Sequence, residues 1–144
     1  MRKTTQINNS FKAPKDENHH QCSKRVLLIE DNLEIRENVT ELLEIAGYEV
    51  VVAPNGSSAI LLAKEKLPNI ILCDIKMPKF NGYKILLNLK NDSITSSIPF
   101  IFITAKAEKK DRTIAMKMGA DKYIIKPFEA DFLLNEIVAC LKPK

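Results

Sequence analysis

Residues 25–53, RVLLIEDNLEIRENVTELLEIAGYEVVVA, contain one complete unit of the fold. The unit opens with a short apolar run, Val26–Ile29, and closes with a second mainly apolar run, Glu49–Val52. Between them, apolar residues recur every three or four positions and most acidic residues fall off that stripe, which is typical of an amphipathic helix. Gly47 follows as the expected left-handed helix stop. The stretch predicts a strand, a helix and a second strand.

The rest of the chain repeats this alternation. Further strands are predicted at 70–73, 100–104 and 123–125, and further helices at 57–66, 83–90, 109–118 and 130–141. The strands show almost no alternation of apolar and polar residues, which predicts that they are covered on both faces. Because crossovers between parallel strands are right-handed, five such units predict an α/β fold, a doubly wound parallel sheet between helices.

Length and composition fit one domain with a core: 144 residues, 45% hydrophobic and 28% charged. No apolar run approaches the roughly 20 residues that span a bilayer. The polar residues after Met1-Arg2-Lys3 are unlike a signal peptide, and three cysteines are too few for a disulfide framework. We therefore expect a cytoplasmic protein with no membrane partner.

The net charge of +4 is unevenly distributed, because residues 1–24 carry +3 and the remainder carries +1. Residues 1–23 are polar and show no sustained period, which predicts a flexible polar leader before a domain at 24–144. A nearly balanced domain lacks the electrostatic footprint of a DNA-binding module. We expect no direct contact with nucleic acid.

Reactive side chains stand at the carboxyl ends of four predicted strands. Glu30 and Asp31 follow the first, Asp74 follows the third, Thr104 ends the fourth and Lys126 follows the fifth. Ligands of open parallel sheets collect at these ends. If the first and third strands are neighbours, each carboxylate pair at ~4 Å repels by roughly 4 kcal/mol at an effective dielectric near 20. With Lys126 the site stands near −2, which predicts one divalent ion, Mg²⁺ by its oxygen ligands, with Mn²⁺ able to substitute.

These groups suit phosphoryl transfer. Asp74 is the candidate nucleophile at phosphorus, while the metal and Lys126 would neutralise charge on the equatorial oxygens and the Thr104 hydroxyl would donate a hydrogen bond to one of them. The product would be an aspartyl phosphate. Its charge near −2 would strengthen the pull on Thr104 and Lys126, which is the predicted switch.

Over residues 24–143 the chain resembles the receiver domain of two-component response regulators, the family that includes the single-domain chemotaxis regulator. The resemblance rests on motifs that occur in order at the strand ends: Glu30-Asp31, Asp74 with Met77-Pro78 and Gly82, Thr104-Ala105, and Lys126-Pro127-Phe128. It implies a flavodoxin-like fold with strand order 2-1-3-4-5, which places the first strand beside the third.

The resemblance also implies the chemistry of the site. Asp74 would be the phospho-acceptor, and a histidine kinase or a histidine phosphotransfer protein would be the donor. The metal ligands would be Asp31, Asp74 and the main-chain carbonyl of Lys76, with Glu30 acting through a bound water. As a receiver the chain would not be an enzyme, because it would catalyse only its own phosphorylation and dephosphorylation.

The switch and the output surface are likewise implied by the resemblance. Tyr123 would be the switch aromatic, turning inward when Thr104 moves toward the phosphoryl group, and the Lys126-Pro127 bond is expected to be cis. The output surface would consist of the helix predicted at 109–118, the last strand and the last helix. Because this surface is rich in lysine, we expect a downstream protein with an acidic patch to bind there.

Two positions depart from the family's commonest pattern. Lys76 and Lys106 stand two residues after Asp74 and Thr104 and would flank the phosphoryl group. An ammonium there would pair with a phosphoryl oxygen and obstruct an in-line water. We predict a phosphoryl state that lives longer than with acidic or amide side chains at these positions.

Other functions remain open on the sequence. A pseudo-receiver would keep the fold and work without phosphorylation, although the complete set of acids, Thr104 and Lys126 argues against it. A phosphatase of the haloacid-dehalogenase type needs an Asp-x-Asp motif, and the third position here is Lys76. The last predicted helix ends just before Lys144, which favours a stand-alone receiver over the receiver fragment of a larger regulator or hybrid kinase.

Overall fold

The computed structural model describes residues 23–77 and 79–143. Within them, strands and helices alternate in the order β1 (Arg25–Ile29), α2 (Leu33–Ile45), β2 (Glu49–Ala53), α3 (Gly56–Lys66), β3 (Ile70–Cys73), α4 (Gly82–Lys90), β4 (Phe100–Thr104), α5 (Lys109–Lys117), β5 (Lys122–Ile125) and α6 (Ala130–Leu141). Each predicted element is present. Almost all of the predicted leader, the motif residue Pro78 and Lys144 lie outside the described residues. None of the described helices combines the length and the apolar character needed to cross a bilayer.

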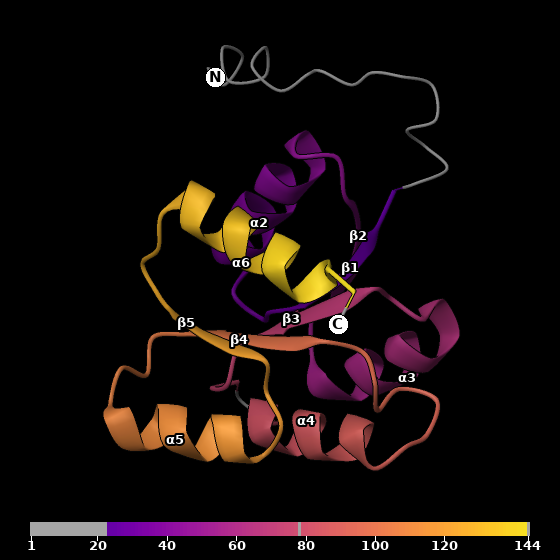
Figure 1. The fold of residues 1–144 in the computed structure, drawn as a ribbon, viewed down its shortest axis with the longest axis vertical. Helices are drawn as coiled ribbons and strands as arrows, with labels where there is room; N and C mark the ends of the chain where they lie inside the picture. Colours follow the sequence, from indigo (N-terminus) through magenta and orange to yellow (C-terminus); the bar gives the residue numbers. More distant parts are fainter. Residues whose placement is uncertain (1–22, 78, 144) are drawn as a thin grey trace.

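The strands form one parallel sheet in the order β2-β1-β3-β4-β5. Helices α2 and α6 cover one face, and α3, α4 and α5 cover the other (Figure 1). This is the predicted doubly wound topology with its 2-1-3-4-5 order. The strand order reverses between β1 and β3, whose registers pair Ile29 with Cys73. The segments that follow these two strands therefore emerge side by side.

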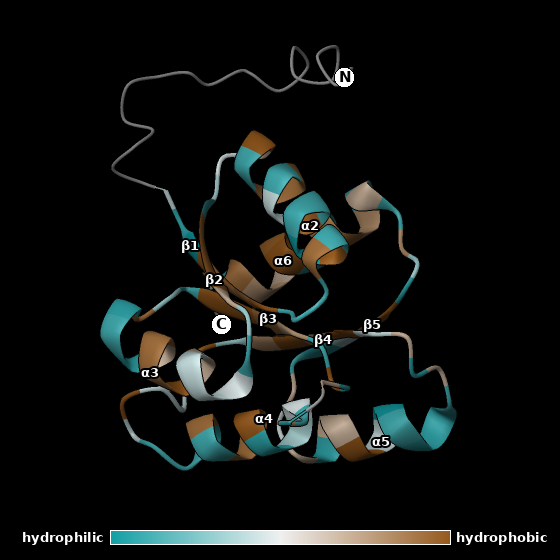
Figure 2. Ribbon diagram, turned by 180° about the vertical axis from the view of Figure 1, so that it is seen from behind, coloured by the Kyte–Doolittle hydropathy of each residue, from teal (hydrophilic) through white to brown (hydrophobic). Residues whose placement is uncertain are grey.

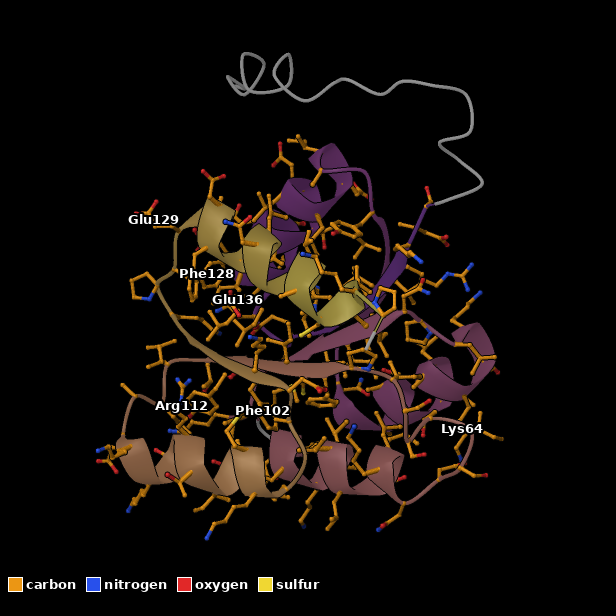
Figure 3. All side chains as sticks on the ribbon, viewed as in Figure 1. Lys64, Phe102, Arg112, Phe128, Glu129 and Glu136 are labelled. Carbon is orange, nitrogen blue, oxygen red and sulfur yellow. The ribbon has the colours of Figure 1, made fainter. Side chains whose placement is uncertain are left out.

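Side chains of the sheet feed two separate cores. Val26 and Leu28 of β1 pack on the side of α2 and α6, whereas Leu27 and Ile29 pack on the side of α3, α4 and α5. The strands are largely brown in a view coloured by hydropathy, while the helices expose teal turns (Figure 2). Phe102 of β4 lies between the sheet and the layer of α4 and α5 (Figure 3). Burial on both faces explains why β1, β3 and β4 read as continuous apolar runs.

The edge strand β2 is covered less completely than the central strands. Val51 packs against the core beside α3 and Val50 against the core beside α2, but Val50 to Val52 are only half-buried. The reason is topological, because β2 is an edge strand and only β1 pairs with it.

Asparagine caps begin the three helices that follow β1, β2 and β3. The side chains of Asn32, Asn55 and Asn81 accept hydrogen bonds from main-chain N–H groups in the first turns of α2, α3 and α4. Such caps satisfy donors that have no partner within the helix. They also fix where the preceding loops end, and these loops form the carboxyl edge of the sheet. Gly47 lies just beyond α2 with φ of 100°, the predicted left-handed stop.

The two helical layers differ in charge. On one side, α2 carries four glutamates against Arg36, and α6 carries Asp131 and Glu136 with no basic residue. On the other, α4 carries Lys84 and Lys90 with no acidic residue, and the charged residues of α5 are Lys109, Lys110, Arg112 and Lys117 against Asp111. The near balance of charge in the domain therefore hides an acidic layer and a basic layer on opposite faces of the sheet.

Candidate functional site

Main-chain pairing carries two carboxylates to the same edge of the sheet. The N–H of Glu30 donates to the carbonyl of Ala53 at 3.2 Å, and the N–H of Asp74 donates to the carbonyl of Ile29 at 3.1 Å. Each bond extends the sheet by one residue beyond its strand. Glu30, Asp31 and Asp74 each offer one carboxylate oxygen, and these three oxygens lie within 4.8 Å of one another. The predicted neighbourhood of the first and third strands is confirmed.

Lys126 lies between two of these acids. Its ammonium is 3.2 Å from Oε1 of Glu30 and 3.2 Å from Oδ2 of Asp74. The lysine side chain is 15% exposed, so the pairs are largely withdrawn from water. The main-chain N–H of Lys126 donates to the carbonyl of Thr104 at 2.9 Å, which holds the loop after β5 against the end of β4. The Lys126-Pro127 bond is cis, as the resemblance implies.

The site is left with more negative than positive charge. Burial raises the pKa of Glu30, the Lys126 ammonium opposes that rise, and the neighbouring Asp74 adds to it. Asp31 is more accessible than the other two acids and has no such lysine contact among the described ion pairs. Three carboxylates against one ammonium leave room for a divalent cation, and the donors are all oxygen atoms. The cluster is therefore a candidate site for Mg²⁺.

The loop after Asp74 closes tightly upon itself. The N–H of Lys76 donates to Oδ1 of Asp74 at 3.3 Å, while the residue itself is exposed. The N–H of Gly82 donates to the carbonyl of Ile75 at 2.7 Å. A Cβ at position 82 would lie 2.5 Å from the carbonyl oxygen of Asp74, so only glycine fits there. The start of α4 thus holds the carboxylate-bearing loop.

Thr104 and Tyr123 meet on one residue, Lys106. The buried Thr104 hydroxyl accepts from the N–H of Lys106 at 3.2 Å, and the Tyr123 hydroxyl donates to the carbonyl of Lys106 at 2.8 Å. Tyr123 is 5% exposed and its ring packs edge-on against Phe102. Burial is the largest cause that raises the pKa of Tyr123, to about 12. The structure thus holds the predicted switch aromatic inward, and its movement with Thr104 stays a prediction.

Sequence reasoning missed Asp111, a buried acid in the first turn of α5. Its carboxylate lies 3.8 Å from the Lys106 ammonium, and its carbonyl accepts from the Tyr83 hydroxyl at 3.4 Å. A signal was present in the sequence, because position 111 lies four residues before Ala115 on the buried side of the helix. An acid on the inner stripe of a short helix indicates a specific partner.

Known proteins share the sequence pattern and the fold of this chain. The chain matches the family described as "Response regulator receiver domain" over residues 26–138. It is 36% identical over 119 residues to the phosphate regulon transcriptional regulatory protein PhoB of Pseudomonas aeruginosa, covering 83% of this chain and 52% of that protein. It is 34% identical over 119 residues to the probable transcriptional regulator ycf27 of Pyropia yezoensis, covering 83% and 48%. The chain thus spans about half the length of these curated relatives.

Solved structures show the same fold. The chemotaxis protein CheY4 of Vibrio cholerae superposes with a TM-score of 0.79 at 27% identity, covering 83% of this chain and all of that one. A response regulator receiver domain protein from Clostridium thermocellum gives 0.76 at 32% identity, covering 82% and 94%. The acidic cluster with its lysine, the 2-1-3-4-5 sheet and the family match agree, and the chain belongs to the response regulator receiver domain family.

Proposed function

We propose that Asp74 accepts a phosphoryl group from a histidine kinase or a histidine phosphotransfer protein, in a reaction that requires Mg²⁺. One observation carries this proposal. The Asp74 carboxylate stands at the end of the central strand β3, 3.2 Å from a largely buried ammonium and within an acidic cluster that can hold a cation. The relatives of this chain include regulators of transcription.

The transfer is a displacement at phosphorus. A carboxylate oxygen of Asp74 forms the new bond, and the bond between phosphorus and the donor's imidazole nitrogen breaks, its electron pair leaving with the imidazole. The Lys126 ammonium, already at Oδ2 of Asp74, is placed to pair with a phosphoryl oxygen. The Thr104 hydroxyl accepts from Lys106 and keeps its own hydrogen free to donate to a second oxygen.

The residues present suit magnesium. Asp31, Asp74 and the main-chain carbonyl of Lys76 would hold the ion, and Glu30 would contact it through a water, an all-oxygen set that fits Mg²⁺ and would also accept Mn²⁺. The bound ion would neutralise charge on the phosphoryl oxygens. The chain's own contribution is to hold the acids together before the ion arrives, because main-chain bonds fix Glu30 and Asp74.

Phosphorylation would be read by another protein at the surface formed by α5, β5 and α6. The phosphoryl group would draw Thr104 toward it, and Tyr123, already inward and bonded to the same Lys106, would follow that movement. Lysines of α5 and the exposed side chains of Ile125 and Phe132 suit a partner that is acidic around an apolar centre. We place this exchange in the cytoplasm, with no direct contact to nucleic acid or membrane. The chain would act only on its own phosphorylation.

The test uses acetyl phosphate as a small donor. The full chain is incubated with acetyl phosphate and Mg²⁺, and its intact mass is measured. We expect one added phosphoryl group, none in Asp74→Asn, and none when EDTA removes the metal. Asp131→Asn, the same change at an exposed residue of α6, is the matched control and is expected to be phosphorylated like the wild type.

Two results would overturn the proposal. A wild-type chain that stays unmodified with both acetyl phosphate and a phosphorylated histidine phosphotransfer protein would favour the pseudo-receiver. Modification that persists in Asp74→Asn would move the acceptor elsewhere.

A further inference from the structure

Lys106 is the meeting point of three parts of the molecule. Its N–H bonds the Thr104 hydroxyl, its carbonyl accepts from the Tyr123 hydroxyl, and its ammonium lies 3.8 Å from Oδ1 of Asp111. The main chain of Lys106 is therefore bonded to Thr104, while its side chain pairs with an acid of α5. The resemblance to receiver domains implies that the same ammonium would flank the phosphoryl group.

Asp111 occupies an unusual place for an acid. Its side chain is 12% exposed, and its carboxylate contributes to raising the pKa of both Tyr83 and Tyr123. The Tyr83 hydroxyl donates to its carbonyl, and the Tyr83 ring packs edge-on against Phe102 at a centroid distance of 5.6 Å. Two tyrosines that pack on the same core ring thus hold the main chain of Lys106 and of Asp111, while the Lys106 side chain stays partly exposed.

The geometry of the pair indicates that it can be exchanged. A separation of 3.8 Å is longer than a hydrogen bond, so the attraction is Coulombic and loosely directed. The lysine side chain is 36% exposed, which screens the pair and lets the ammonium swing. The acid stands in the first turn of α5, where the helix favours negative charge and tolerates the loss of its cation.

We propose that Asp111 is a positioning residue that competes with the phosphoryl group for the Lys106 ammonium. This inference rests on the proposed function. In the unphosphorylated chain Asp111 holds the ammonium beside α5. After phosphorylation of Asp74, a group of charge near −2 attracts the ammonium more strongly than one carboxylate does. The ammonium then shields the phosphoryl group from water for the fraction of time that it is away from Asp111.

The competition predicts the sign of the change in phosphoryl lifetime, which a purely structural role of Asp111 would not. Removing the Asp111 charge leaves the ammonium entirely to the phosphoryl group, so the phosphoryl state lives longer. For a half-exposed ion pair we expect a change of about two- to fivefold. The effect requires the Lys106 ammonium and vanishes when Lys106 is replaced by an uncharged side chain.

The experiment is a double-mutant cycle on the phosphoryl lifetime. The full chain and its Asp111→Asn, Lys106→Met and doubly substituted variants are phosphorylated with acetyl phosphate and Mg²⁺ and transferred to buffer with Mg²⁺ alone. The phosphorylated fraction is then followed by intact mass. We expect slower loss in Asp111→Asn, and no difference between Lys106→Met with and without Asp111→Asn. Asp111→Glu is expected to restore the faster loss.

Glu108→Gln is the matched control, because Glu108 directly precedes α5 and its ion pair among the described residues is with Lys110 at 3.7 Å, whereas Lys106 pairs with Asp111. It removes one negative charge at the same end of the helix and should leave the lifetime unchanged. Should Asp111→Asn unfold, as judged by circular dichroism, Asp111→Ser carries the comparison, since serine is smaller and keeps an uncharged hydroxyl in place of the carboxylate.

Several outcomes would overturn the inference. These are an unchanged or shorter lifetime in folded Asp111→Asn or Asp111→Ser, an equal effect of Glu108→Gln, or an effect that persists in the Lys106→Met background. The last would mean that Asp111 acts through the packing of α5. Failure of the proposed function would give a distinct result, because neither the wild type nor any variant would then gain a phosphoryl group.

Discussion

The electrostatics of the site depend on Lys126. Its ammonium sits between Glu30 and Asp74, and without it three acids would face one another at the end of the sheet. A largely buried charge that loses its partner is costly, whereas the intact set is compensated. The lysine compensates the acids in the structure as it stands, and under the proposed function it would also pair with the phosphoryl oxygens.

The two lysines that flank the site are expected to slow loss of phosphate. Replacing them together, as Lys76→Asn with Lys106→Glu, removes both ammonium groups and opens the in-line path to water, so the phosphoryl group should be lost faster. The lifetime is measured by intact mass after removal of acetyl phosphate. Lys84→Asn with Lys110→Glu makes the same charge change at exposed positions and serves as the control. An unchanged lifetime in the first pair would remove the idea.

Residues of the site could be predicted where each directly follows or ends a strand. This class contains Glu30, Asp74, Thr104 and Lys126. The carboxyl ends of parallel strands all lie at one edge of the sheet, so a residue there has a known position in the fold. Asp111 could not be assigned in the same way. Its partner Lys106 lies in a loop, and the distance between a loop side chain and a helix side chain depends on packing that no period in the sequence encodes.

At the scale of elements, two glycines set how closely helices approach the site. At Gly82 the obstacle to a Cβ is the main chain of Asp74 and Ile75, which cannot give way. At Gly56, the first residue of α3, the obstacle is the ring of Phe80, which a Cβ would overlap. Phe80 lies in the loop between Asp74 and α4, so this contact ties the start of α3 to the loop that follows Asp74.

The Gly56 contact gives a test by rescue. Gly56→Ala should destabilise the fold by about 1–3 kcal/mol, because the new methyl group overlaps the Phe80 ring. Adding Phe80→Ala removes the obstacle, and the double variant should be more stable than the sum of the two single changes predicts. Urea unfolding of the four proteins measures this coupling. Strictly additive free energies would show that the ring can move aside at no cost.

The element pattern was predictable to within a residue at each of the bounds proposed, whereas the exposure of the strands was not uniformly so. Val50–Val52 read like the buried strands, yet β2 is half-buried. A run of valines indicates that a strand can be covered on both faces, but it does not indicate whether the strand lies at the centre or at the edge of the sheet. That place follows from the crossovers, and the order 2-1-3-4-5 leaves β2 at an edge.

At the scale of the whole molecule, the tyrosines make stability depend on alkaline pH. Burial raises the pKa of Tyr48, Tyr83 and Tyr123, the last to about 12. The folded chain therefore holds these protons more tightly than the unfolded chain. This contribution to the free energy of unfolding is complete below about pH 10, the ordinary pKa of tyrosine, and is lost as the pH rises toward 12.

Unfolding by urea across that pH range should show the loss of stability. In Tyr123→Phe the decline should be shallower, since the group with the largest upward shift is gone, although the variant starts from a lower stability without its bond to Lys106. A decline as steep as that of the wild type would assign the pH dependence to other groups.

The opposite charge of the two helical layers has a consequence for encounter. A body that is acidic over α2 and α6 and basic over α4 and α5 is an electric dipole, and the field of an approaching protein exerts a torque on it. A positively charged protein is therefore expected to approach the side of α2, and a negatively charged protein the side of α5, before either touches the surface. This orienting torque acts mainly when the two proteins are within a Debye length of each other, ~8 Å at physiological ionic strength.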